Sequence, residues 1–184
     1  DTLQSLRIVR SRLRSLPGTI GSLLALTNLD LSNVNISSLP DSIGQLVRLK
    51  LLDLRRCNLT LLPDTIGQLA ALSTLNVSDC NDLLSLPDTI GHLNMLKNLD
   101  LSGCGELTSL PHTIEKLSAL ETLKISDCEG LTSVPDALCQ LKVLITLDLG
   151  RCSQLRSLPD AIDQLGTLRE LTLSGCSQLT LIPE

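Results

Sequence analysis

Cysteine is the residue type in this sequence with the most obvious capacity for chemistry. Six of the seven cysteines recur at intervals of 23 or 24 residues: Cys57, Cys80, Cys104, Cys128, Cys152 and Cys176. A row of thiols could bind metal ions or close disulfides. No Cys-x-x-Cys pair is present, however, and the seventh cysteine, Cys139, falls outside the row. The near-constant interval indicates that each of the six occupies the same place in a repeated unit.

Histidine offers little more, because His92 and His112 are the only two and neither belongs to the segments that carry the cysteine row. A Cys–His pair for nucleophilic catalysis would have to cross the interior. Phosphate-binding-loop, H-E-x-x-H and G-x-S-x-G signatures are absent. The sequence therefore predicts no catalytic residue, no metal site and no cofactor, and so no enzyme.

The prolines define the repeated unit. All eight, from Pro17 to Pro183, are spaced by 23, 23, 24, 24, 24, 24 and 24 residues, which leaves none for a linker. Between them recurs the pattern L-x-x-L-x-L-x-x-[N/C]-x-x-L, as in Leu96 to Leu107. This period and pattern are typical of leucine-rich repeats, in which each coil of a solenoid contributes one short parallel strand and one convex segment. One coil cannot bury its leucines alone, so neighbouring coils must stack.

We therefore predict an α/β fold, a right-handed leucine-rich repeat solenoid (horseshoe) with a parallel β-sheet on the concave face and short helical or 3₁₀ segments on the convex face. Residues 1–184 are expected to form one domain of about eight 23–24-residue repeats. The chain starts and stops inside a repeat, which indicates a fragment without end caps. Open sheet edges at such ends favour end-to-end self-association.

Stacked coils would place the six cysteines in a row at the strand spacing of about 4.8 Å. Their side chains would run parallel, which favours neither disulfide closure nor a tetrahedral metal cage. We predict a structural cysteine rung of buried thiols that pack and donate weak hydrogen bonds to the turn backbone. So many unpaired thiols are typical of a reducing compartment, which favours a cytoplasmic location.

The convex segment reads Pro-Asp-Thr-Ile-Gly-Gln-Leu at Pro63 to Leu69. Proline suits the first position of a helical turn, and the aspartate after it lies favourably near the positive end. Later repeats replace the glycine with Glu115, Cys139 and Asp163. The glycine position therefore needs no positive φ, and we expect it to be exposed.

On the concave face, the side chains between the strand leucines point outward, where a partner would bind. One column runs through Asp53, Asn76, Asp100, Lys124 and Asp148, with Arg7 and Asp30 before it. Its charges can compensate one another, with Lys124 between Asp100 and Asp148, and each such cross-strand pair contributes roughly 0.2–1 kcal/mol. The column therefore fits a self-satisfied surface as well as a binding site.

A second candidate contact surface on the same face consists of Lys50, Leu51, Arg55 and Arg56 in the third repeat. Ile145 and Val9 are lone apolar residues there. An apolar residue rimmed by arginines is typical of a protein contact, although scattered apolar residues are also ordinary. We predict that a protein partner binds the concave face through these residues and the column.

Composition narrows the kind of partner. The absence of Phe, Tyr and Trp leaves no rings for base stacking, and the net charge of −5 disfavours nucleic acid and anionic membranes as partners. No apolar run approaches the ~20 residues of a membrane span. Charge is also uneven: residues 1–60 carry eight Lys/Arg and four Asp/Glu, whereas residues 61–184 carry seven and sixteen. Such polarity could orient a partner along the solenoid.

The repeat L-x-x-L-x-L-S-G-C-x-x-L-x-x-L-P-x-x-I-x-x-L, as in Leu96 to Leu117, resembles that of plant intracellular nucleotide-binding immune receptors, especially the Toll/interleukin-receptor-like type. This resemblance covers essentially the whole chain. It implies a module that senses a pathogen protein or modified host protein and restrains a nucleotide-binding domain. The second and third repeats, with LP-x-[ST]-I-G, are similar also to cytoplasmic plant scaffolds of the Ras-group-related type. That similarity leaves a signalling scaffold or adaptor as the alternative.

Overall fold

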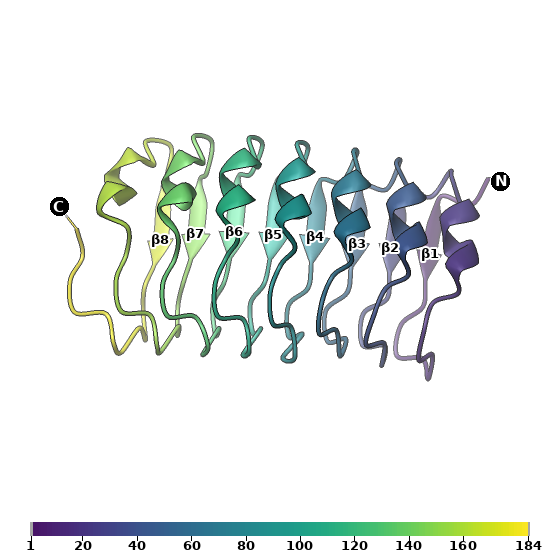
Figure 1. Cartoon of the computed structure of the whole chain (residues 1–184), viewed down its shortest axis with the longest axis horizontal. Coiled ribbons are helices and arrows are strands. Elements are labelled where there is room, and N and C mark those ends of the chain that lie inside the picture. Colours follow the sequence, from purple (N-terminus) through teal and green to yellow (C-terminus); the bar gives the residue numbers. More distant parts are fainter. Residues whose placement is uncertain (1, 184) are drawn as a thin grey trace.

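The computed structural model describes residues 2–183, which stack as successive coils of one solenoid (Figure 1). Within these described residues, eight three-residue strands form one parallel sheet in chain order. They are β1 (Ser5–Arg7), β2 (Asn28–Asp30), β3 (Leu51–Asp53), β4 (Thr74–Asn76), β5 (Asn98–Asp100), β6 (Thr122–Lys124), β7 (Thr146–Asp148) and β8 (Glu170–Thr172). Each strand residue pairs with the residue at the same position of the next repeat, so that Leu75 lies opposite Leu99 and Leu99 lies opposite Leu123.

Short 3₁₀ helices of five residues lie on the other side of the solenoid, as Figure 1 shows. They are η1 (Gly18–Ser22), η2 (Asp41–Gln45), η3 (Asp64–Gln68), η4 (Asp88–His92), η5 (His112–Lys116), η6 (Asp136–Gln140) and η7 (Asp160–Gln164). The predicted α/β leucine-rich repeat solenoid, with a parallel sheet opposite short 3₁₀ segments, is thus confirmed.

Proline was predicted at the first position of each of these turns, but it lies one residue before that position. Pro63 is the N-cap, with φ −69° and an extended ψ of 150°, and Asp64 is the first helical residue. The proline carbonyl accepts the first bond of the turn, from the Ile66 N–H at 2.9 Å. The extended ψ lets proline end the preceding segment while its carbonyl still closes the turn.

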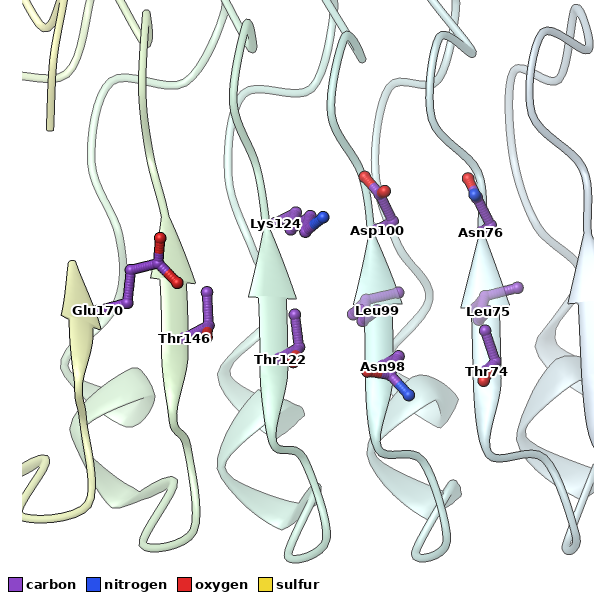
Figure 2. A pocket seen from close by; sticks show the side chains of 10 residues that line it. All are labelled: Thr74, Leu75, Asn76, Asn98, Leu99, Asp100, Thr122, Lys124, Thr146 and Glu170. Carbon is purple, nitrogen blue, oxygen red and sulfur yellow. The ribbon is translucent and has the colours of Figure 1, made fainter. Parts of the chain in front are cut away.

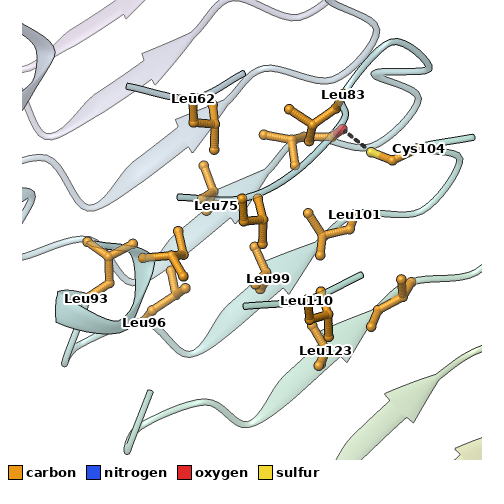
Figure 3. Close-up of a cluster of buried hydrophobic side chains, with 14 of the residues drawn as sticks. Leu62, Leu75, Leu83, Leu93, Leu96, Leu99, Leu101, Cys104, Leu110 and Leu123 are labelled. Carbon is orange, nitrogen blue, oxygen red and sulfur yellow. Dashed lines mark hydrogen bonds between the residues drawn. The ribbon is translucent and has the colours of Figure 1, made fainter. Parts of the chain in front are cut away.

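The core is continuous along the solenoid and is built almost entirely from aliphatic side chains. Figure 3 shows it around Leu99 and Leu101, which are 1% and 0% exposed. The end coils are more open, because Leu6 is only partly buried and Leu171 is 37% exposed. Burial of the inward leucines therefore depends on a coil on either side, as the repeat pattern requires.

The convex glycines were expected to be exposed, and this expectation is wrong. Gly21, Gly44 and Gly91 are buried, although none has a positive φ. A Cβ added at Gly44 would lie 2.6 Å from the Thr65 carbonyl oxygen in the next coil. The glycines are thus contact points between the stacked turns. The sequence suggested a surface position because polar residues replace the glycine in later repeats. Two of these replacements, Glu115 and Asp163, are indeed exposed.

The chain reverses direction after each strand through a residue in the left-handed region. Gly103 and Gly175 occupy this left-handed position in two coils, with φ of 74° and 83°. The other coils have a residue with a side chain there, with φ between 52° and 59°: Arg10, Asn33, Arg56, Asp79, Asp127 and Arg151. The N–H at this position donates to the neighbouring coil, as from Arg56 to the Ser78 carbonyl at 2.9 Å. Glycine adopts this conformation freely, and Asn and Asp tolerate it.

Candidate functional site

The exposed face of the sheet, called the sheet face below, contains a hollow of about 450 Å³ over β4 to β8. Figure 2 shows how its lining is arranged. Short polar side chains line one side at the first position of each strand: Thr74, Asn98, Thr122 and Thr146. Asn76, Asp100 and Lys124 line the other side, and Glu170 lies at the β8 end. The hollow therefore offers hydroxyl, amide and charged groups, the types that bind peptide backbone and polar side chains.

The column from Asp53 to Asp148 serves the fold as well as the surface. Asp53, Asp100 and Asp148 each accept a hydrogen bond from the backbone N–H two residues later, at 3.2, 3.0 and 2.9 Å. Asn76 does the same for Ser78 at 2.9 Å. These side chains hold the chain where it leaves the strand, a role suited to Asp and Asn.

Asp30, at the same position in β2, shows the electrostatic result of this arrangement. Burial acts to raise the pKa of Asp30, but hydrogen bonds from Ser32 and the charges of Arg7 and Arg55 outweigh burial and hold that pKa below its ordinary value. Arg7 pairs with Asp30 at 2.9 Å, and Arg55 pairs with Asp53 at 2.8 Å. Charge compensation in the first coils is thus direct.

Lys124 differs from the expectation that its two aspartate neighbours would compensate it. Among residues 2–183, it makes no ion pair within 4.0 Å. Asp100 and Asp148 instead direct a carboxylate oxygen to the N–H groups of Ser102 and Gly150. An exposed ammonium group therefore borders the hollow and is available to a ligand.

The second candidate surface is divided by the structure. Lys50 and Leu51 lie at the start of β3, whereas Arg55 and Arg56 follow its end. All three residues of β3 therefore lie between Lys50 and the turn that carries Arg55 and Arg56. Ile145, 38% exposed, precedes β7 at the level of Lys50.

Sequence reasoning did not identify Arg10 as a site residue, but the structure places it in one groove with Arg7, Arg55 and Arg56. A signal was available in the Ser-Gly-Cys tripeptides of two later repeats. Glycine at Gly103 marks the left-handed position, and this makes an arginine at the same position conspicuous.

The six cysteines form a stacked row on the strand-exit side of the core. Each thiol donates to the backbone carbonyl of the preceding coil, over 3.0 to 3.3 Å. Figure 3 shows the bond from Cys104 to the Val77 carbonyl, which is 3.3 Å long. Burial raises the pKa of Cys80 and Cys128 to about 12 and that of Cys152 to about 11. Thiols held protonated in this way are poor nucleophiles.

No group of three or more His, Cys, Asp or Glu side chains within residues 2–183 is placed to hold a metal ion. His92 and His112 are exposed on η4 and η5, away from the cysteine row. In the same part of the chain, none of the helices has the length and hydropathy needed to cross a bilayer.

The raised pKa values predict that stability falls in alkaline solution. Above pH 9.0, the ordinary value for these thiols, the unfolded chain loses protons that the folded chain retains until about pH 12. The unfolded state then binds fewer protons, so each thiol costs about 1.4 kcal/mol per pH unit within this window. The urea concentration at the unfolding midpoint should therefore decrease as the pH is raised from about 8 to about 10.5. Replacing Cys80 with valine, the residue found at Val34, should reduce this fall, and a midpoint independent of pH would contradict the prediction.

Comparison with known proteins identifies relatives by sequence and by structure. A family model described as "Leucine-rich repeat region" matches residues 2–109, and one described as "Zer-1-like, Leucine-rich repeats" matches residues 87–158. No curated protein matches the sequence.

Several solved structures have the same fold. The Leptospira interrogans LRR protein LIC12759 is 30% identical, with a TM-score of 0.63 over 98% of this chain and 60% of that protein. The leucine-rich repeat domain of the type III effector XCV3220 (XopL) is 27% identical, with a TM-score of 0.78 over 93% of this chain and 69% of that one. The Arabidopsis receptor kinase HAESA, solved with the peptide hormone IDA and the co-receptor SERK1, is 24% identical, with a TM-score of 0.68 over 94% of this chain and 29% of that one. This last likeness concerns the fold alone.

Proposed function

Because the chain belongs to the leucine-rich repeat family, we propose that it is a protein-recognition module that binds its partner on the sheet face. Leucine-rich repeat solenoids are typically non-catalytic and present an extended binding surface. The observation that carries the proposal is the hollow over β4 to β8, where short polar side chains lie beside the unpaired Lys124. A partner segment lying across several strands would meet one such side chain per coil.

The proposal is tested with a combinatorial peptide library selected on the chain. Selected peptides should lose at least ten-fold in affinity when Thr122 and Lys124 are changed to alanine, since both side chains line the hollow. A matched control replaces the exposed residues Gln45 and Gln68 of the opposite side. A library that yields no binder, or binders affected equally by both pairs, would contradict a recognition role for this face.

The Lys50, Leu51 and Arg55 set is tested separately because it spans both ends of β3. Changing all three to alanine should weaken the binding of a partner that reaches the third coil. The alanine variant should lose some stability, because Leu51 is half-buried and Arg55 pairs with Asp53 at 2.8 Å, so binding is compared well below the unfolding midpoint of the variant. Selected ligands that bind the variant and the parent equally would remove this surface from the site.

We further propose that the module is the ligand-sensing and autoinhibitory region of a plant intracellular immune receptor that acts in the cytoplasm. This is supported by the Leu-Ser-Gly-Cys repeat at Leu101 and Leu173 and by seven free thiols. The alternative, a cytoplasmic signalling scaffold, is supported by the shorter second and third repeats. The gene sequence upstream of the Asp1 codon distinguishes them. A nucleotide-binding domain with a phosphate-binding loop supports the receptor, and a bare array of repeats supports the scaffold.

The isolated chain is also proposed to associate end to end. Apolar side chains are exposed at both ends of the solenoid. Leu181 is 72% exposed and Ile182 is 59% exposed at one end, where Leu171 is also exposed, and Leu3 is 43% exposed at the other end. The β1 and β8 edges carry unpaired backbone groups that another copy could extend. The sedimentation coefficient should therefore rise with concentration, and a coefficient that stays monomeric at all concentrations would contradict this expectation.

A further inference from the structure

A groove of about 700 Å³ runs along the strand-exit side of the first four coils. Its lining includes Arg7, Arg10, Arg55, Arg56 and Val9. Asp79 is the one carboxylate among the lining residues, against four guanidinium groups. This arginine groove lies within the basic part of an otherwise acidic chain. Asp30 and Asp53 pair with two of these arginines from beside the groove, so four positive and three negative groups leave a net charge of +1. This net positive charge favours an anionic ligand.

Three of the four guanidinium groups are held in place by carboxylates but remain accessible. Arg7 pairs with Asp30, Arg55 with Asp53, and Arg56 with Asp79 at 3.1 Å. Their side chains are nevertheless 73%, 48% and 64% exposed. Since each is already oriented, a ligand would lose less side-chain entropy on binding them.

Arg10 is not held in this way, because it forms no ion pair within 4.0 Å in the described part of the chain. It lies next to Val9, which is only partly buried. The groove thus combines a free positive charge with a small apolar surface. A matching ligand carries an aliphatic side chain between carboxylates.

The backbone gives a second and independent indication. Arg10 and Arg56 both occupy the left-handed position, at φ 52° and 57°. That conformation costs a residue with a Cβ roughly 1–2 kcal/mol. Gly103 and Gly175 avoid the cost in two later coils, and Arg151 is the one arginine with this conformation outside the groove among the described residues. Two unfavourable arginines that line one groove are the kind of local strain that accumulates at functional sites.

We propose that the arginine groove binds an acidic peptide segment of a partner protein, with an aliphatic side chain against Val9 and carboxylates on Arg10 and Arg56. This inference rests on the proposed function, because it specifies the chemistry of the protein that the module recognises. It also places that contact at the strand-exit side, outside the hollow over β4 to β8.

The test uses a fluorescein-labelled peptide of sequence Glu-Glu-Val-Glu-Glu and fluorescence anisotropy in about 50 mM salt, where screening is modest. The double variant Arg10→Gly, Arg56→Gly should bind at least ten-fold more weakly. Its thermal midpoint should not fall, because glycine accepts the positive φ at both places. The loss of binding therefore does not arise from unfolding.

Two controls separate the groove from net charge and from backbone relief. Arg151→Gly removes an arginine from the same left-handed position in a later coil, and Arg12→Ser removes an exposed arginine of the first coil that does not line the groove. Both should leave the Kd of the peptide within about two-fold, since only lining charges make direct contact.

Failure of this inference can be told from failure of the recognition role. If the acidic peptide does not bind, or if the double variant and both controls bind it equally, the arginine groove is not its site. Library peptides that depend on Thr122 and Lys124 would then still support recognition on the sheet face. Preference of the groove for anionic vesicles over the peptide would also overturn the proposal, since it would identify a lipid surface as the ligand.

Discussion

Replacing Leu99 with alanine should lower the free energy of unfolding by roughly 2–5 kcal/mol, the range for large-to-small changes in a tightly packed core. Leu99 is 1% exposed and is paired with Leu75 on one side and Leu123 on the other. The alanine therefore leaves a cavity that two adjoining coils surround. Equilibrium urea unfolding of the variant measures the loss.

The matched control is Leu171→Ala, which makes the same change at the same position of the last strand. Leu171 is 37% exposed because no coil covers its outer side. Its replacement should cost less than about 1.5 kcal/mol, since much of the side chain is already in water. Equal losses at the two positions would show that burial does not depend on a coil at either side.

Adding a single methyl group at Gly44 should also destabilise the protein, by roughly 1–3 kcal/mol. The new Cβ would lie 2.6 Å from the Thr65 carbonyl oxygen, which is backbone and cannot rotate away. Stacked 3₁₀ turns would have to separate to admit it. The unfolding midpoint of Gly44→Ala measures this cost.

Gly166→Ala is the control, and its effect should have the opposite sign. A Cβ at Gly166 meets no atom within 4 Å, and its φ is not in the left-handed region. Alanine there reduces the freedom of the unfolded chain and should stabilise by roughly 0.4–1 kcal/mol. If both alanine variants shift the midpoint in the same direction and by a similar amount, the glycine contact does not set the spacing of the turns.

The fold was predictable because the apolar period is the same in nearly every repeat. Leu99 and Leu101 share one face of a strand, and the proline interval locates each convex turn. The buried glycines were not predictable by the same reasoning. Whether Gly44 faces solvent or the next coil depends on how closely two turns approach, and a repeat pattern does not specify that distance.

The candidate site was predictable only in part. Alternation along the strand correctly placed Asp53, Asn76 and Lys124 in one column. It could not show that each aspartate of the column accepts a hydrogen bond from the backbone N–H two residues later, because that bond forms only where the chain turns. For the same reason the sequence separated Arg10 from Arg56, which line one groove only when the coils stack.

Site-resolved native-state hydrogen exchange tests most directly the claim that all coils share one core beneath an open sheet. The Leu101 amide donates to the Lys124 carbonyl at 2.8 Å and should be among the most protected. The Ile8 amide donates to the Asp30 backbone carbonyl, also at 2.8 Å, and should be among the least protected. Opening free energies should rise from both ends to one maximum near β5, because end coils lack a neighbour. Two maxima separated by a weakly protected coil would show two independent cores and contradict the account.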